Sequence, residues 1–308
     1  MQRIQYHEYG GPEVLRLEEF EPRRPGRGEV LVRIKAAAAN PLDFGVRRGL
    51  MRPITGSSFP RGYGHDFSGV VAEVGPGVTA FRPGGEVFGG MYPRPSGAYA
   101  EMGVVSAKHI VHKPAGLSFE AAATIPTIGV TARQAVLDKG RLQPGQSIFV
   151  TGCLGGVGRT AVQVALAHGG VVAGSCRDSK ASEARALGVD PVAGFDLDPA
   201  SFTGLDVVVD AAHTLSKRDA LTMLKRSGRF VDIHPTPLKM LRSLLPGRHK
   251  TLFGSWRTAD LVALADAGAS GEMDFPVART VPLADAIAAL HELETQGTPK
   301  GGRLVVLP

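Results

Sequence analysis

Residues 147–158 read SIFVTGCLGGVG, and after Arg159 the chain continues as TAVQVALAHG over residues 160–169. A short apolar run, closely spaced glycines and then a helical pattern predict a strand, a tight turn and a helix. Glycines let the backbone turn sharply and approach a pyrophosphate, while free N–H groups at the helix start attract its negative charge. We therefore expect a dinucleotide at this turn. A turn that merely joins a strand to a helix is the alternative.

The segments around the glycine turn favour the dinucleotide interpretation. Apolar runs typical of buried strands recur at residues 171–174, 206–210 and 228–233, and helix-like stretches separate them. Residues 119–138, FEAAATIPTIGVTARQAVLD, are alanine-rich with helical spacing and lead into the turn. Alternating strands and helices predict a doubly wound α/β sheet.

The first third of the chain, to about Leu117, has a different character. Segments such as residues 29–34 and 69–74 are β-like and lie among many Gly and Pro breaks, which predicts a small β-rich domain. Near the end, residues 259–268 and 283–295 are candidate amphipathic helices, and Arg303–Leu307 is a candidate strand. We expect this tail to return to the first domain.

Composition narrows the class of protein. A chain of 308 residues with 43% hydrophobic and 21% charged residues is long enough for two domains and is typical of a soluble globular protein. No stretch approaches the roughly 18 to 20 uninterrupted apolar residues that span a bilayer, and the amino terminus has no apolar signal core, so we expect a cytoplasmic location without a membrane partner. The net charge of +6 is spread along the chain, which disfavours nucleic-acid binding.

The two cysteines, Cys153 and Cys176, lie in the glycine turn and just after the next strand. Their number and placement indicate free thiols in a reducing compartment and no disulfide framework. Packing or cofactor lining is favoured over a catalytic thiol, because no nearby base is evident.

Six short motifs accompany the glycine turn in a fixed order along the chain. They are Gly28-Glu29-Val30-Leu31-Val32, Ala39-Asn40-Pro41-Leu42-Asp43, Gly64-His65-Asp66-Phe67-Ser68-Gly69-Val70-Val71, Val74-Gly75-Pro76-Gly77-Val78, Leu187-Gly188-Val189-Asp190 and Lys300-Gly301-Gly302-Arg303-Leu304-Val305. Together they resemble the medium-chain dehydrogenase/reductase superfamily, specifically its zinc-independent quinone oxidoreductase branch. The resemblance implies a GroES-like catalytic domain over residues 1–123 and 257–308, with a Rossmann NADPH-binding domain inserted at 124–256.

The resemblance also bears on metal binding. Zinc members of this superfamily hold a catalytic zinc with a cysteine, a histidine in a Gly-His-Glu motif and a further cysteine or acidic ligand. Here Asn40 stands in the place of the first cysteine, the motif reads Gly64-His65-Asp66, and no cysteine lies near residues 124–131. An amide is a poor zinc ligand, so we expect a metal-free site. A zinc-type alcohol dehydrogenase stays as an alternative.

The end of the second strand predicts which dinucleotide binds. NAD-selective folds usually place Asp or Glu there, whereas this chain reads Ser175-Cys176-Arg177-Asp178-Ser179-Lys180. Arg177 and Lys180 suit a 2′-phosphate, which predicts NADPH, although Asp178 would favour NAD if it pointed inward. The expected cofactor-binding residues, the two threonines by resemblance, are Thr127, Thr131, Gly152, Gly155, Gly156, Val157, Gly158, Ser175, Arg177 and Lys180.

The expected chemistry is hydride transfer to a conjugated acceptor. Without zinc nothing strong stabilises an alkoxide, whereas a quinone or an α,β-unsaturated carbonyl delocalises the charge onto an oxygen that hydrogen-bond donors can hold. By resemblance, Asn40 and Asp43 supply donors and positioners, while the alternative for Asn40 is to hold its own turn. The candidates for the proton donor are Tyr63, His65, Tyr92 and solvent, and a structural role for His65 is the alternative.

Two further expectations concern function and assembly. A catalytically weak NADPH-binding protein with a structural or RNA-binding role is the competing function. Relatives commonly pair through the edge strand of the cofactor sheet, which we expect at Thr251–Ser255, so a homodimer is the expected assembly.

Overall fold

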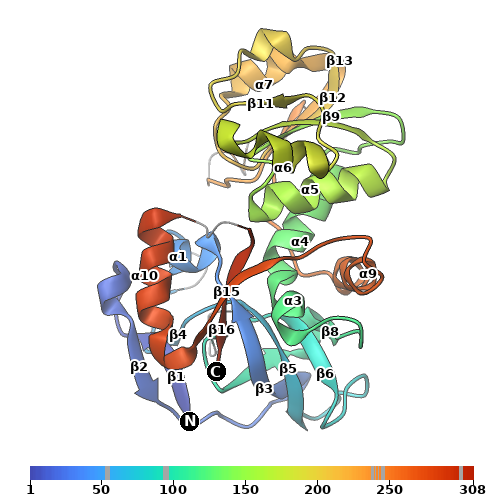
Figure 1. Ribbon diagram of the computed structural model, residues 1–308. Helices are drawn as coiled ribbons and strands as arrows, with labels where there is room; N and C mark the ends of the chain where they lie inside the picture. The colour runs from blue at the N-terminus through green and yellow to red at the C-terminus, as the bar shows by residue number, and fades with distance from the viewer. Residues whose placement is uncertain are drawn as a thin grey trace. The chain divides into compact units, whose positions relative to one another are not determined.

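The computed structural model shown in Figure 1 describes residues 1–52, 56–92, 97–236, 239, 241, 243, 247–297 and 301–308. Lys300 of the last sequence motif lies outside these residues. The chain divides into two compact units, which we call the first unit (Met1–Thr127 with Trp256–Pro308) and the second unit (Ile128–Ser255). Each is described by itself.

The second unit is built on a six-stranded parallel sheet with the order β11-β10-β9-β12-β13-β14. This order runs outward in both directions from the neighbours β9 and β12, which defines a doubly wound sheet with its switch point between them. The α/β fold class expected from the sequence is confirmed. The strands are β9 (Ser147–Thr151), β10 (Val171–Ser175), β11 (Val192–Ala193), β12 (Leu205–Asp210), β13 (Leu224–Asp232) and β14 (His249–Thr251).

Helices cover both faces of this sheet. Helix α5 packs on β9 and β10, and α7 packs on β12 and β13 from the opposite side (Figure 1). The buried positions of α5 include Ala161, Val164 and Ala165, the spacing of one helical face. Helices and helical turns in and leading into this unit are α4 (Pro126–Arg133), η3 (Gln134–Lys139), α5 (Gly156–Ala167), η4 (Asp178–Lys180), α6 (Ala181–Ala186), η5 (Pro199–Ser201) and α7 (Lys217–Met223).

The first unit contains two sheets. The larger, seven-stranded sheet has the order β15-β16-β3-β5-β6-β8 with β7 also paired to β3, and the smaller has the order β2-β1-β4. The carboxyl-terminal strand β16 pairs antiparallel with β3, where Val305 lies opposite Ala38, so the tail returns to the first unit as expected. The strands are β1 (Gln2–Tyr6), β2 (Arg16–Glu19), β3 (Glu29–Ala38), β4 (Arg61–Gly62), β5 (Asp66–Val74), β6 (Glu86–Gly90), β7 (Met102–Ser106), β8 (Ile110–His112), β15 (Val277–Pro282) and β16 (Arg303–Leu307).

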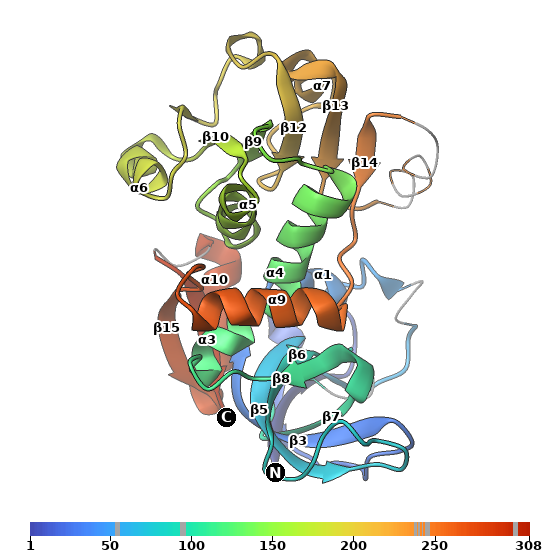
Figure 2. The same ribbon diagram turned by 90° about the vertical axis from the view of Figure 1, so that its right-hand side faces the viewer.

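Short helices flank the first unit's larger sheet, and Figure 2 shows α3 and α9 beside it. Helix α3 packs on β3, β5 and β16, while α9 contacts β8. The core between the sheets and α10 is apolar and aromatic, with Tyr6, Phe67, Tyr99 and Leu290 fully buried. The helices and helical turns are η1 (Pro12–Val14), α1 (Pro41–Arg47), η2 (Ala107–His109), α3 (Phe119–Thr124), α9 (Thr258–Ala269), η6 (Leu283–Asp285) and α10 (Ala286–Gln296).

The expected edge strand needs a correction. The strand at this end of the second unit's sheet is β14, which spans His249–Thr251, so residues 252–255 of the expected segment lie beyond it. Main-chain pairing of Phe230 with His249 and of Asp232 with Thr251 fixes the register of β14. Across the part of the chain that the structure describes, every helix is too short or too polar to cross a membrane.

Candidate functional site

The glycine turn between β9 and α5 has the backbone geometry of a phosphate cradle. Gly152 has φ +59°, a conformation that L side chains rarely adopt. A Cβ atom on Gly158 would lie 2.1 Å from the carbonyl oxygen of Gly152, so both positions require glycine. Gly155 is exposed and precedes the first turn of α5, whose N–H groups have no partners within the helix. This geometry fits the pyrophosphate of a dinucleotide.

Arg177 and Lys180, the two cations expected near the end of β10, have different surroundings in the structure. Arg177 is exposed, and its guanidinium makes no ion pair within the described residues. Lys180 donates to Glu183 over 2.6 Å, so its charge already has a partner. Asp178 opens the helical turn η4, in keeping with a turn role, and the buried Ser175 hydroxyl has no hydrogen-bond partner there.

Polar residues that the sequence analysis did not select fix the switch point. Thr151 and Asp210 end β9 and β12 side by side, and the Thr151 hydroxyl donates to the Asp210 carboxylate over 2.6 Å. Asp210 also accepts from the backbone N–H of Thr214 over 3.1 Å, which holds the loop after β12. The sequence signal that could have identified Asp210 is its place at the end of the apolar run LDVVVD. The expected Thr131 lies in α4 with its hydroxyl against Gly254.

In the first unit, Asp43 and His65 meet in a buried network. The Asp43 carboxylate, on α1, accepts from Nδ1 of His65, which lies just before β5. The same carboxylate accepts from the Tyr99 hydroxyl over 2.7 Å and from the Asn40 backbone N–H over 2.9 Å. Burial raises the pKa of Tyr99 well above its ordinary value, so this hydroxyl keeps its proton and donates. Asp43 therefore orients the imidazole of His65.

Asp66 forms the other half of this network. Its carboxylate accepts from the backbone N–H of Thr127 over 2.9 Å, from the Thr127 hydroxyl over 2.6 Å and from the Asn40 side-chain amide over 2.7 Å. The carbonyl oxygen of that amide accepts from the buried guanidinium of Arg303. Thr127, expected as a cofactor or helix-start contact, thus binds Asp66 at the start of α4. Arg303 and Tyr99 were not selected from the sequence.

The residues that stand in the place of zinc ligands do not fit a catalytic zinc. Asn40, in the place of the first cysteine ligand, binds Asp66 through its amide nitrogen. The bond from Nδ1 of His65 to Asp43 leaves Nε2 open and does not itself exclude a metal. The guanidinium of Arg303 donates to the side-chain oxygen of Asn40, so the one atom of Asn40 that could bind a metal already has a partner. Neutral amide oxygen is also a poor zinc ligand.

The two candidate tyrosines lie in different surroundings. The Tyr63 hydroxyl is buried and accepts from the guanidinium of Arg47 over 3.1 Å, which makes it part of the core. Tyr92 is exposed, and its ring packs edge-on against Trp256 with centroids 5.1 Å apart. The His65 ring lies 6.4 Å from the same tryptophan. The structure therefore gathers His65, Trp256 and Tyr92 and assigns Tyr63 another set of contacts.

Both cysteines are free and buried. Burial raises the pKa of the Cys153 thiol to about 12, and burial likewise raises the pKa of Cys176. A thiol that keeps its proton is a poor nucleophile. These surroundings agree with a packing role in the second unit.

Asp66 is expected to make stability depend on pH. Burial raises the pKa of its carboxyl to about 6 from 3.8, while hydrogen bonds from Thr127 act in the other direction. The folded chain therefore binds this proton more tightly than the unfolded chain does. This contribution to the free energy of unfolding is fully present below about pH 4, is lost as pH rises through about 6, and amounts to about 2 to 3 kcal/mol.

The measurement is urea unfolding of the wild type and D66N between pH 4 and pH 7.5. The stability of the wild type relative to D66N should fall by that amount as pH rises. Asp266 is exposed on α9, and D266N serves as the control with a flat difference. A D66N difference that does not vary with pH would contradict the prediction.

Comparisons with known proteins agree with this architecture. The alcohol dehydrogenase GroES-like domain family matches residues 26–115, and the zinc-binding dehydrogenase family matches residues 187–306. The chloroplastic quinone-oxidoreductase QR1 of Triphysaria versicolor is 32% identical over 257 residues, which cover 80% of this chain and 78% of that protein. The structure of the Coxiella burnetii quinone oxidoreductase superposes with a TM-score of 0.88 at 27% identity, covering 100% of this chain and 99% of that one. The Escherichia coli quinone oxidoreductase complexed with NADPH gives a TM-score of 0.85 at 28% identity, with 100% of each chain covered.

The fold, the glycine turn and these matches show that the chain belongs to the medium-chain dehydrogenase/reductase superfamily. Within the superfamily it falls in the quinone oxidoreductase branch. It is an oxidoreductase of this type.

Proposed function

We propose that the protein transfers a hydride from NADPH to a quinone or an α,β-unsaturated carbonyl compound without the help of zinc. The observation that carries this proposal is the buried network of Asn40, Asp43, His65 and Asp66, in which Asn40, in the place of the first cysteine ligand, binds Asp66 and Arg303. A site of this kind offers hydrogen bonds and protons and offers no strong Lewis acid. Conjugated acceptors need only hydrogen bonds and a proton, since their carbon skeleton carries the incoming charge to oxygen.

The bound dinucleotide supplies a hydride, and the first unit supplies the proton. When a hydride adds to the β-carbon of an enone, the electron pair of the C=C bond moves and leaves an enolate. His65 is oriented by Asp43 through Nδ1, so Nε2 is the atom that delivers a proton to this anion. The imidazole then regains its proton from solvent. Asn40 already donates its amide to Asp66, so an oxyanion contact from Asn40 would have to replace that bond.

The preference for NADPH is assigned to Arg177, the exposed cation after β10. The R177A variant is expected to raise the KM for NADPH about ten- to hundredfold and to leave the KM for NADH unchanged, because a charge-assisted contact to phosphate is worth about 1.5–3 kcal/mol. Initial rates with each dinucleotide measure this. R218A, which removes an exposed arginine on α7, is the control. Equal KM changes for both dinucleotides would assign Arg177 another role.

The test of the function is a screen for NADPH consumption with quinones, enones, enoyl thioesters, aldehydes and primary alcohols, with the zinc content of the protein measured in parallel. The proposal expects turnover with quinones or enones by protein that holds no stoichiometric zinc. Binding of NADPH without turnover of any acceptor would favour the binding-protein alternative. Tightly held zinc together with alcohol oxidation would favour an alcohol dehydrogenase. A homodimer that pairs through the edge strand β14 stays a prediction.

A further inference from the structure

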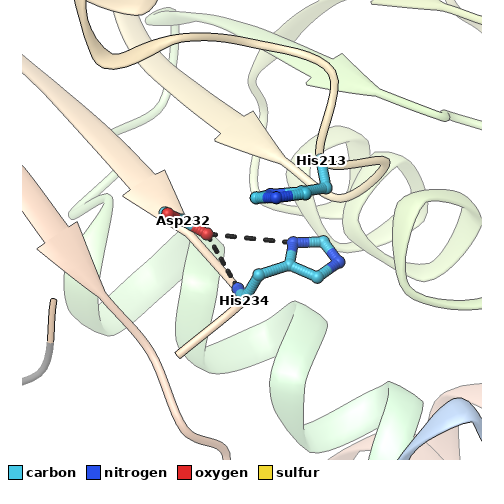
Figure 3. A group of neighbouring side chains, drawn as sticks. All are labelled: His213, Asp232 and His234. Carbon is cyan, nitrogen blue, oxygen red and sulfur yellow. Dashed lines mark hydrogen bonds and ion pairs between the residues drawn. The ribbon is translucent and has the colours of Figure 1, made fainter. Parts of the chain in front are cut away.

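A group of potential metal ligands lies in the second unit, apart from the network around His65. It consists of His213, Asp232 and His234, shown in Figure 3. Asp232 is the last residue of β13, His234 follows it by two positions, and His213 stands in the loop after β12. One ligand atom of each residue lies within 4.8 Å of the ligand atoms of the other two.

We propose that His213, Asp232 and His234 form a binding site for a divalent transition-metal ion, with Zn²⁺ as the probe. Two imidazoles and one carboxylate are a ligand set that such ions accept, with the remaining positions left to water. This site has no residue in common with the place of the zinc ligands in the first unit, and its existence does not depend on the proposed function.

The backbone positions His213 for this role. His213 has φ +57°, in the left-handed region that few residues other than glycine adopt. In this conformation its ring lies over the ring of His234, with the two centroids 4.5 Å apart and the planes tilted by 44°. Figure 3 shows the two rings facing each other beside the carboxylate.

His234 supplies the second observation that points to a ligand. Its Nδ1 atom is buried and has no hydrogen-bond partner among the described residues. An unsatisfied buried nitrogen is costly, and coordination to a metal would satisfy it. The nearest carboxylate oxygen, Oδ1 of Asp232, is 3.8 Å from this nitrogen, so the two atoms face each other without a direct hydrogen bond.

The carboxylate of Asp232 is held from its far side. Lys239 donates to Oδ2 over 2.5 Å, and Nε2 of His249 lies 3.8 Å from the same oxygen. Oδ1 accepts from the backbone N–H of His234 over 2.8 Å and faces the group. Although burial opposes ionisation, the hydrogen bonds from Lys239 and from the His234 backbone N–H, with His249 nearby, hold the pKa of Asp232 well below its ordinary value.

Metal binding requires a modest closure of this group. Zinc bonds of about 2.0–2.2 Å place neighbouring tetrahedral ligands roughly 3.4 Å apart. The imidazole of His213 is exposed and can rotate to close the remaining gap. Asp232 and His234 are the more buried members and provide the fixed side of the site.

The test measures Zn²⁺ binding to the full chain after removal of metal and dinucleotide. The protein competes with a chromophoric chelator for Zn²⁺, and the absorption spectrum of the Co²⁺ form reports the geometry of its ligands. Dinucleotide is removed because the group lies at the carboxyl edge of the parallel strands, where cofactors bind in this fold class. The proposal expects one Zn²⁺ per chain.

Matched variants connect the binding to these side chains. H213N keeps a residue that tolerates a positive φ, and H234Q removes the buried nitrogen. Each is expected to weaken Zn²⁺ binding by about tenfold or more. H291N removes an exposed histidine of α10 and should bind as the wild type does. Weak Zn²⁺ binding that is equal in all four proteins, or an absence of stoichiometric binding to the wild type, would overturn the proposal.

Discussion

The H65N variant is expected to lose about 10²- to 10⁴-fold in kcat with a quinone or an enone, the range for removal of a positioned general acid. The asparagine amide can still donate to Asp43, which accepts from Nδ1 of the native histidine. It has no counterpart of the proton on Nε2. The variant therefore removes proton delivery while it keeps the hydrogen bond that organises Asp43.

Three measurements separate this role from a structural one. The dissociation constant for NADPH and the urea midpoint should stay near the wild-type values, while kcat alone falls. H112N is the control, because His112 is exposed, lies in the first unit and contacts only Phe81 and the backbone carbonyl of Ala80 among the contacts described for its ring. If H65N turns over at the wild-type rate, His65 is a structural residue and the proton comes from solvent.

The E294A variant is expected to lower the free energy of unfolding by about 3–5 kcal/mol, the cost of breaking a buried ion pair from one side. Glu294, on α10, accepts from Nη2 of Arg47 over 2.8 and 2.7 Å. The side chain of Arg47 is 0% exposed and that of Glu294 is 6% exposed. Among the described residues, alanine would leave the guanidinium of Arg47 buried with neutral hydrogen-bond partners, the hydroxyl of Tyr63 and the carbonyl of Gly10. Glu294 also pairs with Arg48, but that side chain is 54% exposed and its loss of a partner costs little.

A neighbouring pair provides the control for E294A. Glu292 binds Arg279 over 2.8 Å, but both side chains are 49% exposed. E292A should therefore cost at most about 1 kcal/mol. Urea unfolding of both variants with a common reference measures the difference. Equal losses from E294A and E292A would show that burial of the Arg47 pair adds nothing to stability.

Local patterns were enough to predict the second unit. The strands β9, β10, β12 and β13 coincide with short apolar runs, and the glycines of the turn are close together in the sequence. In a sheet whose strands alternate with helices along the chain, most elements can be predicted from their own local sequence. The prediction of the edge strand was wrong because the apolar residues Leu252 and Phe253 favour a strand. In the structure, main-chain pairing with β13 instead involves the more polar His249–Thr251.

The network in the first unit depends on contacts that no local pattern shows. His65 binds a carboxylate 22 positions away, and Asp66 binds a hydroxyl 61 positions away. Arg303 reaches Asn40 across 263 positions, and nothing in its motif indicates a buried guanidinium. The sequence could nominate Asn40, Asp43 and His65 through family resemblance, but their partners became visible only in the structure. The group of His213, Asp232 and His234 was not predicted for the same reason, since two loops and the end of a strand bring these residues together.

The place of β16 has a consequence for how the chain matures on the ribosome. This strand lies between β15 and β3, so the larger sheet of the first unit stays incomplete until Arg303–Leu307 have been synthesised. The second unit occupies one continuous stretch that emerges earlier. During translation, the β3 edge that β16 will cover is an unpaired row of amide and carbonyl groups, which leaves the nascent chain open to wrong strand pairing until Arg303–Leu307 have emerged.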